Sequence, residues 1–494
     1  MTLDAIDENS LFLAAEDCDP SEFEKIHKFS SFERKIIRSL IAHGPLLLRG
    51  GRGSGKSALL IEADRQINAE WSNVLSVYVS LRHLPLLRSE GKVYESIFCE
   101  LLLTALNDEL ERLDLPCVDN RPSDAGQLRQ MLVSLGGRIN RRIVLIFDDA
   151  AHIGRENALT EFFDIFRTIS SNVVSCKAAI YPGVTRFGIR FDVFNDATVI
   201  DVARDERSGE FASFFAEVMQ ARFPTLSKKL EKSRGRSLGL ETTASLIGRT
   251  VVGNMRAFVF ACSWLSASAK IGLPDVKDIL LRLASDYYWP LLDEVAPKLG
   301  PYEVLIEPCR NIAEVIFRHA ASTDSGSAIV HREIVQKLGK LFEILEYVGF
   351  ISRREASRSM KSGGRGPRYS LNLANLLETR PKAQLTFDLV DIWLNTSVDS
   401  VEFHASGNQI PLNLPEIDPT QELAVFNLPI QSLAKGKTYV YGLTTRQINL
   451  LLENGYKTIK DVANESDENL HDLEGIGDKT LLRIRNVISQ AIWM

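Results

Sequence analysis

Several signatures of common protein classes are missing from this 494-residue chain. No two of its six cysteines form a Cys-x-x-Cys pair, which argues against a disulfide framework or a zinc site and favours reduced thiols. The eight histidines are dispersed without metal-ligand spacing, and no apolar run approaches membrane-spanning length. Met1 is followed by an acidic stretch, Asp4 to Glu16, which lacks the basic region of a signal peptide. We therefore expect a cytoplasmic protein with no membrane partner.

An excess of basic charge is also missing. The formal net charge is -6 at pH 7, so any contact with nucleic acid must be confined to a local patch. The composition is that of a globular protein, and at about 150 residues per domain the length predicts three or four domains.

The strongest positive signal is a glycine-rich turn between an apolar strand and a helix. Residues 46–60 read LLLRGGRGSGKSALL and satisfy every position of a phosphate-binding P-loop; a chance glycine turn is the alternative. In such a loop the backbone N–H groups converge on the phosphates, Lys56 reaches the β- and γ-phosphates, and the Ser57 hydroxyl is a Mg²⁺ ligand. We therefore expect ATP and Mg²⁺ as cofactors. The expected cofactor-binding residues are Gly50, Gly51, Arg52, Gly53, Ser54, Gly55, Lys56 and Ser57.

A second apolar strand ends in two aspartates. The run Ile143–Phe147 precedes Asp148 and Asp149, which is the pattern of a Walker B element; an ordinary turn at a strand end is the alternative. We expect Asp148 to hold Mg²⁺ through water and Asp149 to polarise the water that attacks the γ-phosphate. Strands such as Val74–Ser80 alternate with helices such as Val93–Leu113, which predicts a parallel α/β sheet.

Two later segments carry further polar candidates. The strand Lys177–Ile180 leads into a connection that holds Thr185, Arg186 and Arg190, and either arginine can serve as a finger toward a neighbouring subunit's nucleotide. Solvated loop arginines are the equally simple alternative. Residues 253–256, Gly-Asn-Met-Arg, open another helix, for which an ordinary N-capped surface helix is the alternative.

Taken together, these motifs resemble AAA+ ATPases of the origin-recognition initiator kind and their relatives, the signalling STAND ATPases. The resemblance implies that Thr185 or Arg186 senses the γ-phosphate, and that Arg256 contacts it and ties the angle of a lid to the nucleotide state. That family usually has glutamate where this chain has Asp149, and the shorter side chain predicts slow hydrolysis. The usual proline is replaced by Met255, and the Asp-Asp ending is more similar to the STAND branch.

The middle of the chain resembles the winged-helix domain that follows the lid in origin-recognition ATPases. The segments that carry the resemblance are an expected helix over 302–321, helices from His331 and over Lys340–Val348, and a hairpin of Phe350–Arg354 with Arg368–Leu371. From Arg353 to Arg368 there are six basic residues and one acidic residue, a composition suited to phosphates. We expect DNA contacts at Arg353, Arg365 and Arg368, with a solvated or partner-binding loop as the alternative. The helix over 340–348 is too apolar to read bases.

The C-terminal segments 441–462 and 473–485 resemble the C-terminal domain of the bacterial RNA polymerase alpha subunit, a pair of helical hairpins. In that family DNA is held by an arginine, an asparagine three residues later, and a Gly-x-Lys-Ser hairpin. The resemblance, with the close approach that glycine amides allow at a helix N-terminus, predicts DNA contacts at Arg446, Asn449, Gly475, Gly477, Lys479 and Thr480. Asp478 replaces an often basic residue and lowers the expected affinity. A protein-docking module is the alternative.

We therefore expect an α/β P-loop NTPase core of the AAA+ type, a helical lid, a winged helix and an all-α tandem helix-hairpin-helix tail. The expected boundaries are 1–205 for the nucleotide-binding core, 206–285 for the lid with sensor 2, 286–380 for the winged helix, 381–420 for a linker and 421–494 for the tail.

The expected function is that of an ATPase switch that forms homo-oligomers and binds DNA under nucleotide control. The alternative is a STAND-like signalling ATPase, for example in anti-phage defence, whose C-terminal modules bind a protein. No nuclease or protease constellation is evident, so an effector would be a separate protein. A processive motor is disfavoured by Asp149.

Overall fold

The computed structural model describes residues 15–16, 18–82, 85–86, 89–151, 156–184, 187–188, 190–231, 238–395, 399–407, 409–418, 421–436, 439 and 442–493. Two of the predicted γ-phosphate sensors, Thr185 and Arg186, lie outside these residues.

A parallel sheet forms the first part of the chain, as the alternation of strands and helices predicts. Its strands are β1 (Leu46–Arg49), β2 (Val74–Ser80), β3 (Arg142–Ala151), β4 (Val174–Ile180) and β5 (Thr198–Asp201). They are arranged in the order β2-β3-β4-β1-β5, and every neighbouring pair is parallel. The short edge strand β5 has largely exposed side chains, so it lacks the apolar run by which the other strands are recognised.

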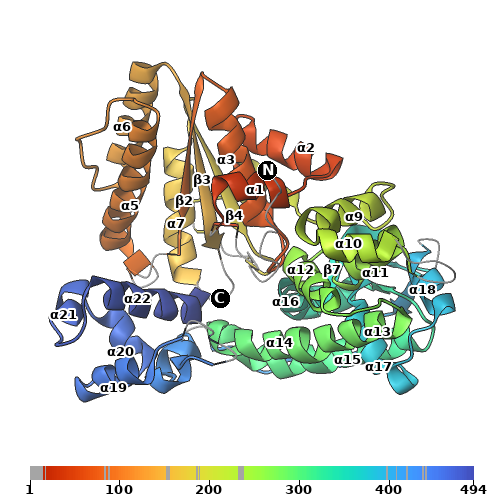
Figure 1. The fold of residues 1–494 in the computed structure, drawn as a ribbon. Helices are drawn as coiled ribbons and strands as arrows, with labels where there is room; N and C mark the ends of the chain where they lie inside the picture. The colour runs from red at the N-terminus through yellow and green to blue at the C-terminus, as the bar shows by residue number, and fades with distance from the viewer. Residues whose placement is uncertain are drawn as a thin grey trace.

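Helices cover both faces of this sheet (Figure 1). They are α1 (Pro20–Ile26), α2 (Ser31–Ile41), α3 (Lys56–Glu70), α5 (Gly91–Arg112), α6 (Ala125–Ile139), α7 (Glu156–Ile169) and the short α8 (Val193–Asp196). Successive side chains of β1 face opposite layers: Leu46 and Leu48 pack with α2 and α3, whereas Leu47 belongs to the core formed with α5, α6 and α7. The P-loop follows β1 and therefore lies at the carboxyl edge of the sheet.

A second unit, here the helical unit (residues 211–403), has one continuous apolar core of its own. Its helices are α9 (Phe211–Arg222), α10 (Pro224–Glu231), α11 (Leu240–Thr250), α12 (Met255–Ser266), α13 (Leu273–Leu283), η1 (Ala284–Tyr288), α14 (Trp289–Val295), η2 (Ala296–Lys298), η3 (Gly300–Leu305), α15 (Ile306–Ala321), α16 (Arg332–Val348), α17 (Leu373–Thr379), η4 (Pro381–Ala383) and α18 (Phe387–Leu394). The segments expected as lid and winged helix thus share buried contacts.

The helical unit also contains a small sheet in the order β7-β8-β6-β9. Its strands are β6 (Ser327–Val330), β7 (Ile351–Ser359), β8 (Arg365–Leu371) and β9 (Val401–Phe403). β7 and β8 form the antiparallel hairpin that the sequence predicts. The two helices expected from His331 and Lys340 are one helix, α16, with non-helical backbone angles at the buried Leu338.

Residues 381–420, expected to be a linker, include elements that form part of the helical unit. α18 buries Leu389, Val390 and Trp393 in its core, and β9 pairs in parallel with β6. Proline-rich neighbouring sequence hides these two elements from a pattern-based prediction because each is only a few residues long.

A buried ion-pair network joins the lid segment to the hairpin. The Glu206 carboxylate accepts hydrogen bonds from Arg354 Nε at 2.7 Å, Arg368 Nη2 at 3.1 Å and Ser370 Oγ at 2.6 Å. Burial alone would raise the pKa of Glu206, but Arg354 and the other donors outweigh it and hold that pKa well below its ordinary value.

Glu206→Ala is therefore expected to destabilise the protein by about 3–5 kcal/mol, because it leaves two buried guanidinium groups without their carboxylate. Since the folded-state pKa is lowered, this contribution is present above the ordinary glutamate pKa of about 4.3 and is lost as the pH falls below it. Denaturant unfolding of the full chain at pH 7 and pH 3.5 measures both effects. Asp399→Ala, which removes an exposed pair with Lys361, should leave the unfolding midpoint unchanged; equal midpoints for Glu206→Ala and the parent at pH 7 would contradict the prediction.

The tail (residues 421–493) is a third unit with a separate apolar core. It consists of η5 (Ala424–Asn427), η6 (Ile430–Leu433), α19 (Thr445–Glu453), α20 (Ile459–Asn464), α21 (Asp467–His471) and α22 (Asp478–Trp493). In Figure 1 it lies below α5 and α7 and beside α14. Within the described residues, no helix combines the length and apolar character needed to cross a membrane.

Candidate nucleotide-binding site

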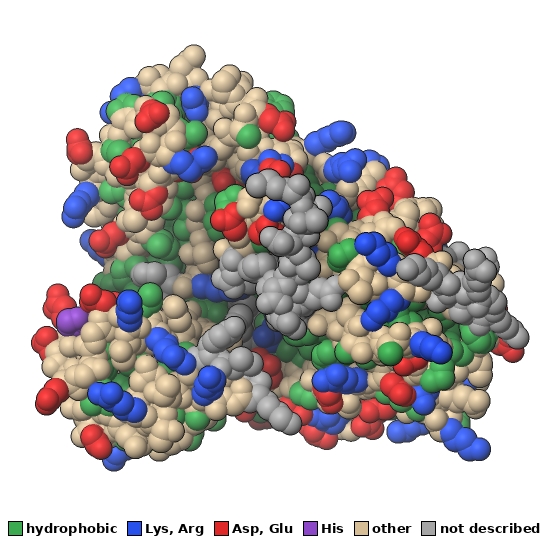
Figure 2. All heavy atoms as spheres, in the orientation of Figure 1, with side chains coloured by type: hydrophobic (Ala, Val, Ile, Leu, Met, Phe, Trp, Pro, Cys, Tyr) green, Lys and Arg blue, Asp and Glu red, His purple; other side chains and the backbone are tan. Residues whose placement is uncertain are grey.

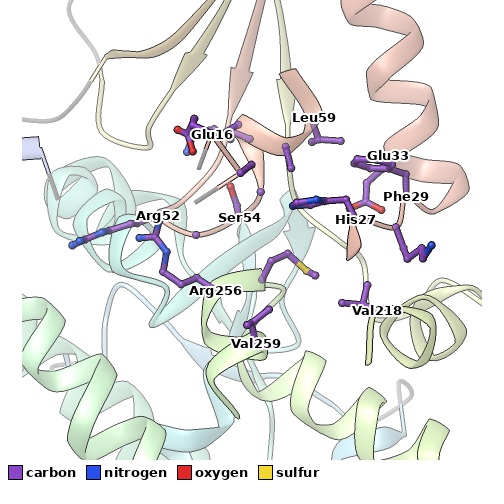
Figure 3. A pocket seen from close by; sticks show the side chains of 18 of the residues that line it. Glu16, His27, Phe29, Glu33, Arg52, Ser54, Leu59, Val218, Arg256 and Val259 are labelled. Atoms are coloured by element: carbon purple, nitrogen blue, oxygen red, sulfur yellow. The ribbon is translucent and has the colours of Figure 1, made fainter. Parts of the chain in front are cut away.

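The P-loop lines a cleft between the parallel sheet and the helical unit. Figure 3 shows Arg52 and Arg256 on one side of the cleft and His27, Phe29 and Val218 on the other. The first side carries the P-loop and its cations, whereas the second combines aromatic and aliphatic groups with the charged Lys28 and Arg222, from α1, the following loop and α9. Such an arrangement suits a ligand with a phosphate end and a flat, largely apolar end.

Two glycines of the loop are required by close backbone approach. A Cβ at Gly51 would lie 2.7 Å from the Glu346 carbonyl oxygen of α16. Gly53 has φ +76°, and a Cβ there would lie 2.3 Å from Asn254 Oδ1. The P-loop therefore packs so closely against the helical unit that neither position has room for a side chain.

Lys56 is buried at the start of α3 and its ammonium group stays inside the loop. Nζ donates to the carbonyl oxygens of Gly50 at 2.8 Å and Gly51 at 3.2 Å, and it lies 3.6 Å from the centre of the Tyr181 ring. Burial lowers the pKa of Lys56 to about 7, against the opposing effect of Asp149 and Asp148. An anion at the loop would stabilise the charged form of this lysine.

The two aspartates predicted from the strand pattern lie next to the P-loop and are almost completely buried. Tyr78 donates its hydroxyl to Asp148 Oδ2 at 2.7 Å, and the Asp149 N–H donates to Asp148 Oδ1 at 2.8 Å. Burial, followed by the charges of Asp149 and Glu16, raises the pKa of Asp148 to about 6, while a hydrogen bond with Ser57 opposes the shift. The Ser57–Asp148 contact places the two expected Mg²⁺ ligands side by side.

Asp149 has a strained backbone and a cationic partner. Its φ of +51° is in the left-handed region, a conformation that is found at functional sites when the surroundings enforce it. Arg82 Nε lies 2.5 Å from Asp149 Oδ2, and the Tyr181 hydroxyl donates to Oδ1 at 3.1 Å. The carboxylate is therefore held by the protein and must exchange a partner before it can orient a water molecule.

The carboxylate groups fit a divalent cation. Oxygens of Glu16, Asp148 and Asp149 lie within 4.8 Å of one another, and Ser57 adjoins them through Asp148. Carboxylate and hydroxyl oxygens are the ligands that Mg²⁺ prefers, and it is usually held by one or two carboxylates together with substrate phosphates.

The Gly-Asn-Met-Arg segment contacts the P-loop directly. Asn254 caps α12 through the Ala257 N–H, and its Nδ2 donates to the Arg52 carbonyl at 3.0 Å. The Met255 N–H donates to the Gly53 carbonyl at 2.8 Å. Arg256 lines the cleft, and among the described residues its buried Nε has no hydrogen-bond partner. The start of α12 is thus positioned to respond to a ligand of the loop.

Arg204 is a second link between the core and the lid that sequence patterns do not reveal. Its Nε donates to Glu33 Oε1 at 3.0 Å, and its Nη1 donates to the carbonyls of Ser54 and Gly253, both at 2.9 Å. The guanidinium is buried with Glu33 as its carboxylate partner. It therefore connects α2, the P-loop and the residues just before α12.

Some functional candidates were missed because no motif marks them. Glu16 and Arg82 lie in the cleft, yet they come from the N-terminal segment and from the loop after β2. The position of Arg82, immediately past the carboxyl end of a parallel strand, is the one available signal. Arg190, a predicted finger candidate, is exposed and is not among the residues that line the cleft.

The hairpin arginines expected at DNA are placed differently from one another. Arg368 is only 6% exposed and faces Glu206, so in this structure it is not available to a phosphate backbone. Arg353 is partly buried and approaches Asp201 of β5 at 3.7 Å. Arg365 is exposed and donates to the hydroxyls of Ser357 and Ser359. Arg353 and Arg368 are paired with acidic residues that are distant in sequence but close in the fold. The number of basic residues in the hairpin therefore overstates the positive charge that is free to bind DNA.

The tail brings its two predicted DNA-contact segments together. A Cβ at Gly475 would lie 3.8 Å from Arg446 Nη2, so the second hairpin adjoins α19. Arg446, Asn449 and Lys479 are exposed. Figure 2 shows Lys and Arg side chains spread across the viewed face of the tail and acidic side chains toward its outer edge.

No family model matches the sequence, and no curated protein matches it. Among solved structures, the ORC2 protein of Aeropyrum pernix in its ADPNP-ADP complexes is 11% identical, with 76% of this chain and 98% of that chain covered and a TM-score of 0.37. Domain III of the replication initiation protein DnaA of Thermotoga maritima is 15% identical, with 53% and 96% covered and a TM-score of 0.31. A STAND protein with a tetratricopeptide repeat sensor from Pyrococcus horikoshii is 11% identical, with 96% and 54% covered and a TM-score of 0.28. Similarity at this level does not assign a function, which rests on the geometry of the site.

Proposed function

We propose that the protein is an AAA+-type ATPase switch, in which nucleotide at the P-loop controls assembly and the engagement of DNA by the tail. The proposal rests on one observation: backbone hydrogen bonds join the helical unit to the P-loop. The Arg52 N–H donates to the Tyr347 carbonyl of α16 at 2.9 Å, and the Gly53 carbonyl accepts from Met255 of α12. A nucleotide that recruits these groups must change what holds the helical unit.

Phosphate binding requires the loop to exchange partners. Lys56 now donates to carbonyl oxygens of its own loop, and the Arg52 amide is occupied by α16. The amides and the lysine would be redirected to the phosphates, and Arg256 would turn its unpartnered Nε toward the γ-phosphate. The contacts to α12 and α16 would weaken or rearrange, which couples occupancy to the position of the helical unit.

Hydrolysis at this site would rest on Asp149. Bound Mg²⁺ would supply charge neutralisation between the β- and γ-phosphates, held by Ser57 and the Asp148 carboxylate. Asp149 would orient the attacking water after it exchanges Arg82 for that water. Because the carboxylate is both short and ion-paired, we propose slow turnover suited to a switch.

DNA engagement is proposed for the tail, with Arg446, Asn449, Gly475, Gly477, Lys479 and Thr480 as its contacts. α22 begins directly after Gly477, so the free amides of its first turn and the exposed Lys479 belong to the same turn. The direct test is DNA binding by the full chain and by a chain that lacks residues 421–494, each with and without ATP. Loss of salt-sensitive binding on deletion supports the proposal, and unchanged binding contradicts it.

Arg446→Ala and Lys479→Ala are each expected to weaken DNA binding and to reduce its salt slope by about one phosphate contact. Nucleotide binding should be normal in both variants because neither residue lines the cleft. Lys460→Ala is the matched control, since Lys460 is paired with Glu422 and is not one of the six predicted contact residues. Fluorescence anisotropy over a salt series measures the slopes; parental slopes for both variants would show that this surface does not hold DNA.

One observation favours a second candidate, a STAND-like signalling ATPase whose tail binds a protein. The segment 421–494 has eight Lys or Arg and nine Asp or Glu, so it has no net basic charge. Asp478, beside Lys479, is exposed. A tail that shows no salt-sensitive DNA affinity, together with ATP-dependent assembly of the chain, would favour this candidate.

A further inference from the structure

The tail reaches the nucleotide cleft with its last helical turn. α22 ends at Trp493, which lines the cleft together with P-loop residues and is 9% exposed. Tyr181, the residue that follows β4, lines the same cleft. Because the tail has its own apolar core, this contact is the docking of one folded unit on another.

A second tail residue, Tyr439, is influenced by the charges of the Arg52–Glu294 pair. Burial raises the pKa of Tyr439, the charge of Glu294 raises it further, and the charge of Arg52 opposes the shift. Arg52 Nη2 in turn lies 3.3 Å from Glu294 Oε1 on α14. The start of the tail is also fixed to this side, because Gln421 Nε2 donates to Glu303 Oε2 at 3.3 Å.

Trp493 thus lines the same cleft as the P-loop and the cations Arg52, Lys56 and Arg256. In Figure 3 Arg52 lies across the cleft from His27 and Val218. ATP and ADP differ at the phosphate end alone: ATP adds a phosphate, its charge and its share of bound Mg²⁺ beside Lys56, Arg256 and Asp149. The Trp493 indole lines this cleft and Arg52 is engaged by Glu294, so an added phosphate would have to compete with both.

We propose that Trp493 is a nucleotide-discriminating residue: the docked tail accepts ADP, and the γ-phosphate of ATP displaces the tail. The inference rests on the proposed binding of nucleotide at the P-loop. If a ligand binds the undocked state more tightly than the docked state, its binding shifts the tail toward the undocked state. By the same linkage, a substitution that weakens docking increases the affinity for that ligand. The γ-phosphate would thereby release the unit that carries Arg446 and Lys479.

The first test measures the affinities of full-length Trp493→Ala for ADP and for a non-hydrolysable ATP analogue, by competition with a fluorescent nucleotide. The analogue is expected to bind about tenfold more tightly than to the parent, whereas the ADP affinity changes less than about threefold. Leu482→Ala is the matched control, because Leu482 is on the same helix, is 62% exposed and does not line the cleft. Equal changes for both nucleotides, weaker binding of both, or no change would overturn the inference.

A second measurement on the unmodified chain guards against a tail that unfolds in the variant. Hydrogen exchange of the last turns of α22 is expected to be faster with the ATP analogue than with ADP. Exchange that is the same with both nucleotides, each at saturation, would contradict displacement of the tail. Failure of the parent to bind either nucleotide would instead refute the proposed function, so the two outcomes are distinguishable.

Discussion

Lys56→Ala is expected to weaken ATP binding by at least about 100-fold. Lys56 is the P-loop side chain that would donate to the β- and γ-phosphates, and two charge-assisted hydrogen bonds of roughly 1.5–3 kcal/mol each are lost with it. Each 1.4 kcal/mol is a factor of about ten in affinity. Isothermal titration calorimetry of the full chain with a non-hydrolysable ATP analogue measures the change.

Arg65→Ala provides the control for this substitution. Arg65 is on the same helix, α3, but pairs with Glu62 and Glu24 outside the cleft. Its loss should leave ATP affinity unchanged. A folded Lys56→Ala protein with parental affinity would remove the basis for placing phosphates at the loop.

Asp149→Asn is expected to reduce ATP turnover by about 10²–10⁴-fold while ATP affinity changes less than about threefold. The amide has the size of the carboxylate but cannot accept the proton of the attacking water, and a positioned general base contributes roughly this factor. The substitution also weakens the ion pair with Arg82. Steady-state phosphate release, with affinity measured separately, resolves the two quantities.

Asp201→Asn is the matched control for Asp149. Asp201 is the last residue of β5 and also lies at the carboxyl edge of the sheet. It pairs with Arg49, the last residue of β1, and does not line the cleft that contains Lys56. Turnover in this variant should equal that of the parent. If Asp149→Asn turns over ATP at the parental rate, another acid, with Glu16 the nearest in the cleft, is the base.

The sequence predicts the parallel sheet of the first unit because its signals are local. The P-loop, the two aspartates and the parallel strands each depend on residues within one strand and the following turn, where sterics and burial act on neighbours in sequence. The structure confirms the parallel α/β sheet, places Lys56 in the lining of the cleft, and pairs the buried Asp149 with Arg82, another lining residue.

Long-range partners account for what the sequence leaves out. Arg82, Arg204 and Glu16 join the site from unrelated segments, and no spacing marks them. The hairpin arginines show the converse effect: Arg354 and Arg368 form part of a basic run in the sequence, yet both are neutralised by Glu206 from the lid segment. Charge counts along a chain cannot reveal such pairing, because it is created by folding.

Contacts between the folded units are equally invisible in the sequence. Two such contacts are the hydrogen bond from the Arg52 amide to the Tyr347 carbonyl and the position of Trp493 in the cleft. Both depend on how the three folded units dock on one another. Tyr347 and Trp493 fit the apolar periodicity of α16 and α22, so a sequence pattern would assign both to the core of their own unit.

The central claim is that phosphate binding at the P-loop is transmitted to the helical unit through α12 and α16. Hydrogen exchange of the full chain, without nucleotide and with a saturating ATP analogue, tests it most directly. The account predicts protection of residues 50–57 together with altered exchange at 251–257 and 345–350, and no change at any of these segments in Lys56→Ala. Protection confined to the P-loop, with both distant segments unchanged, would contradict it.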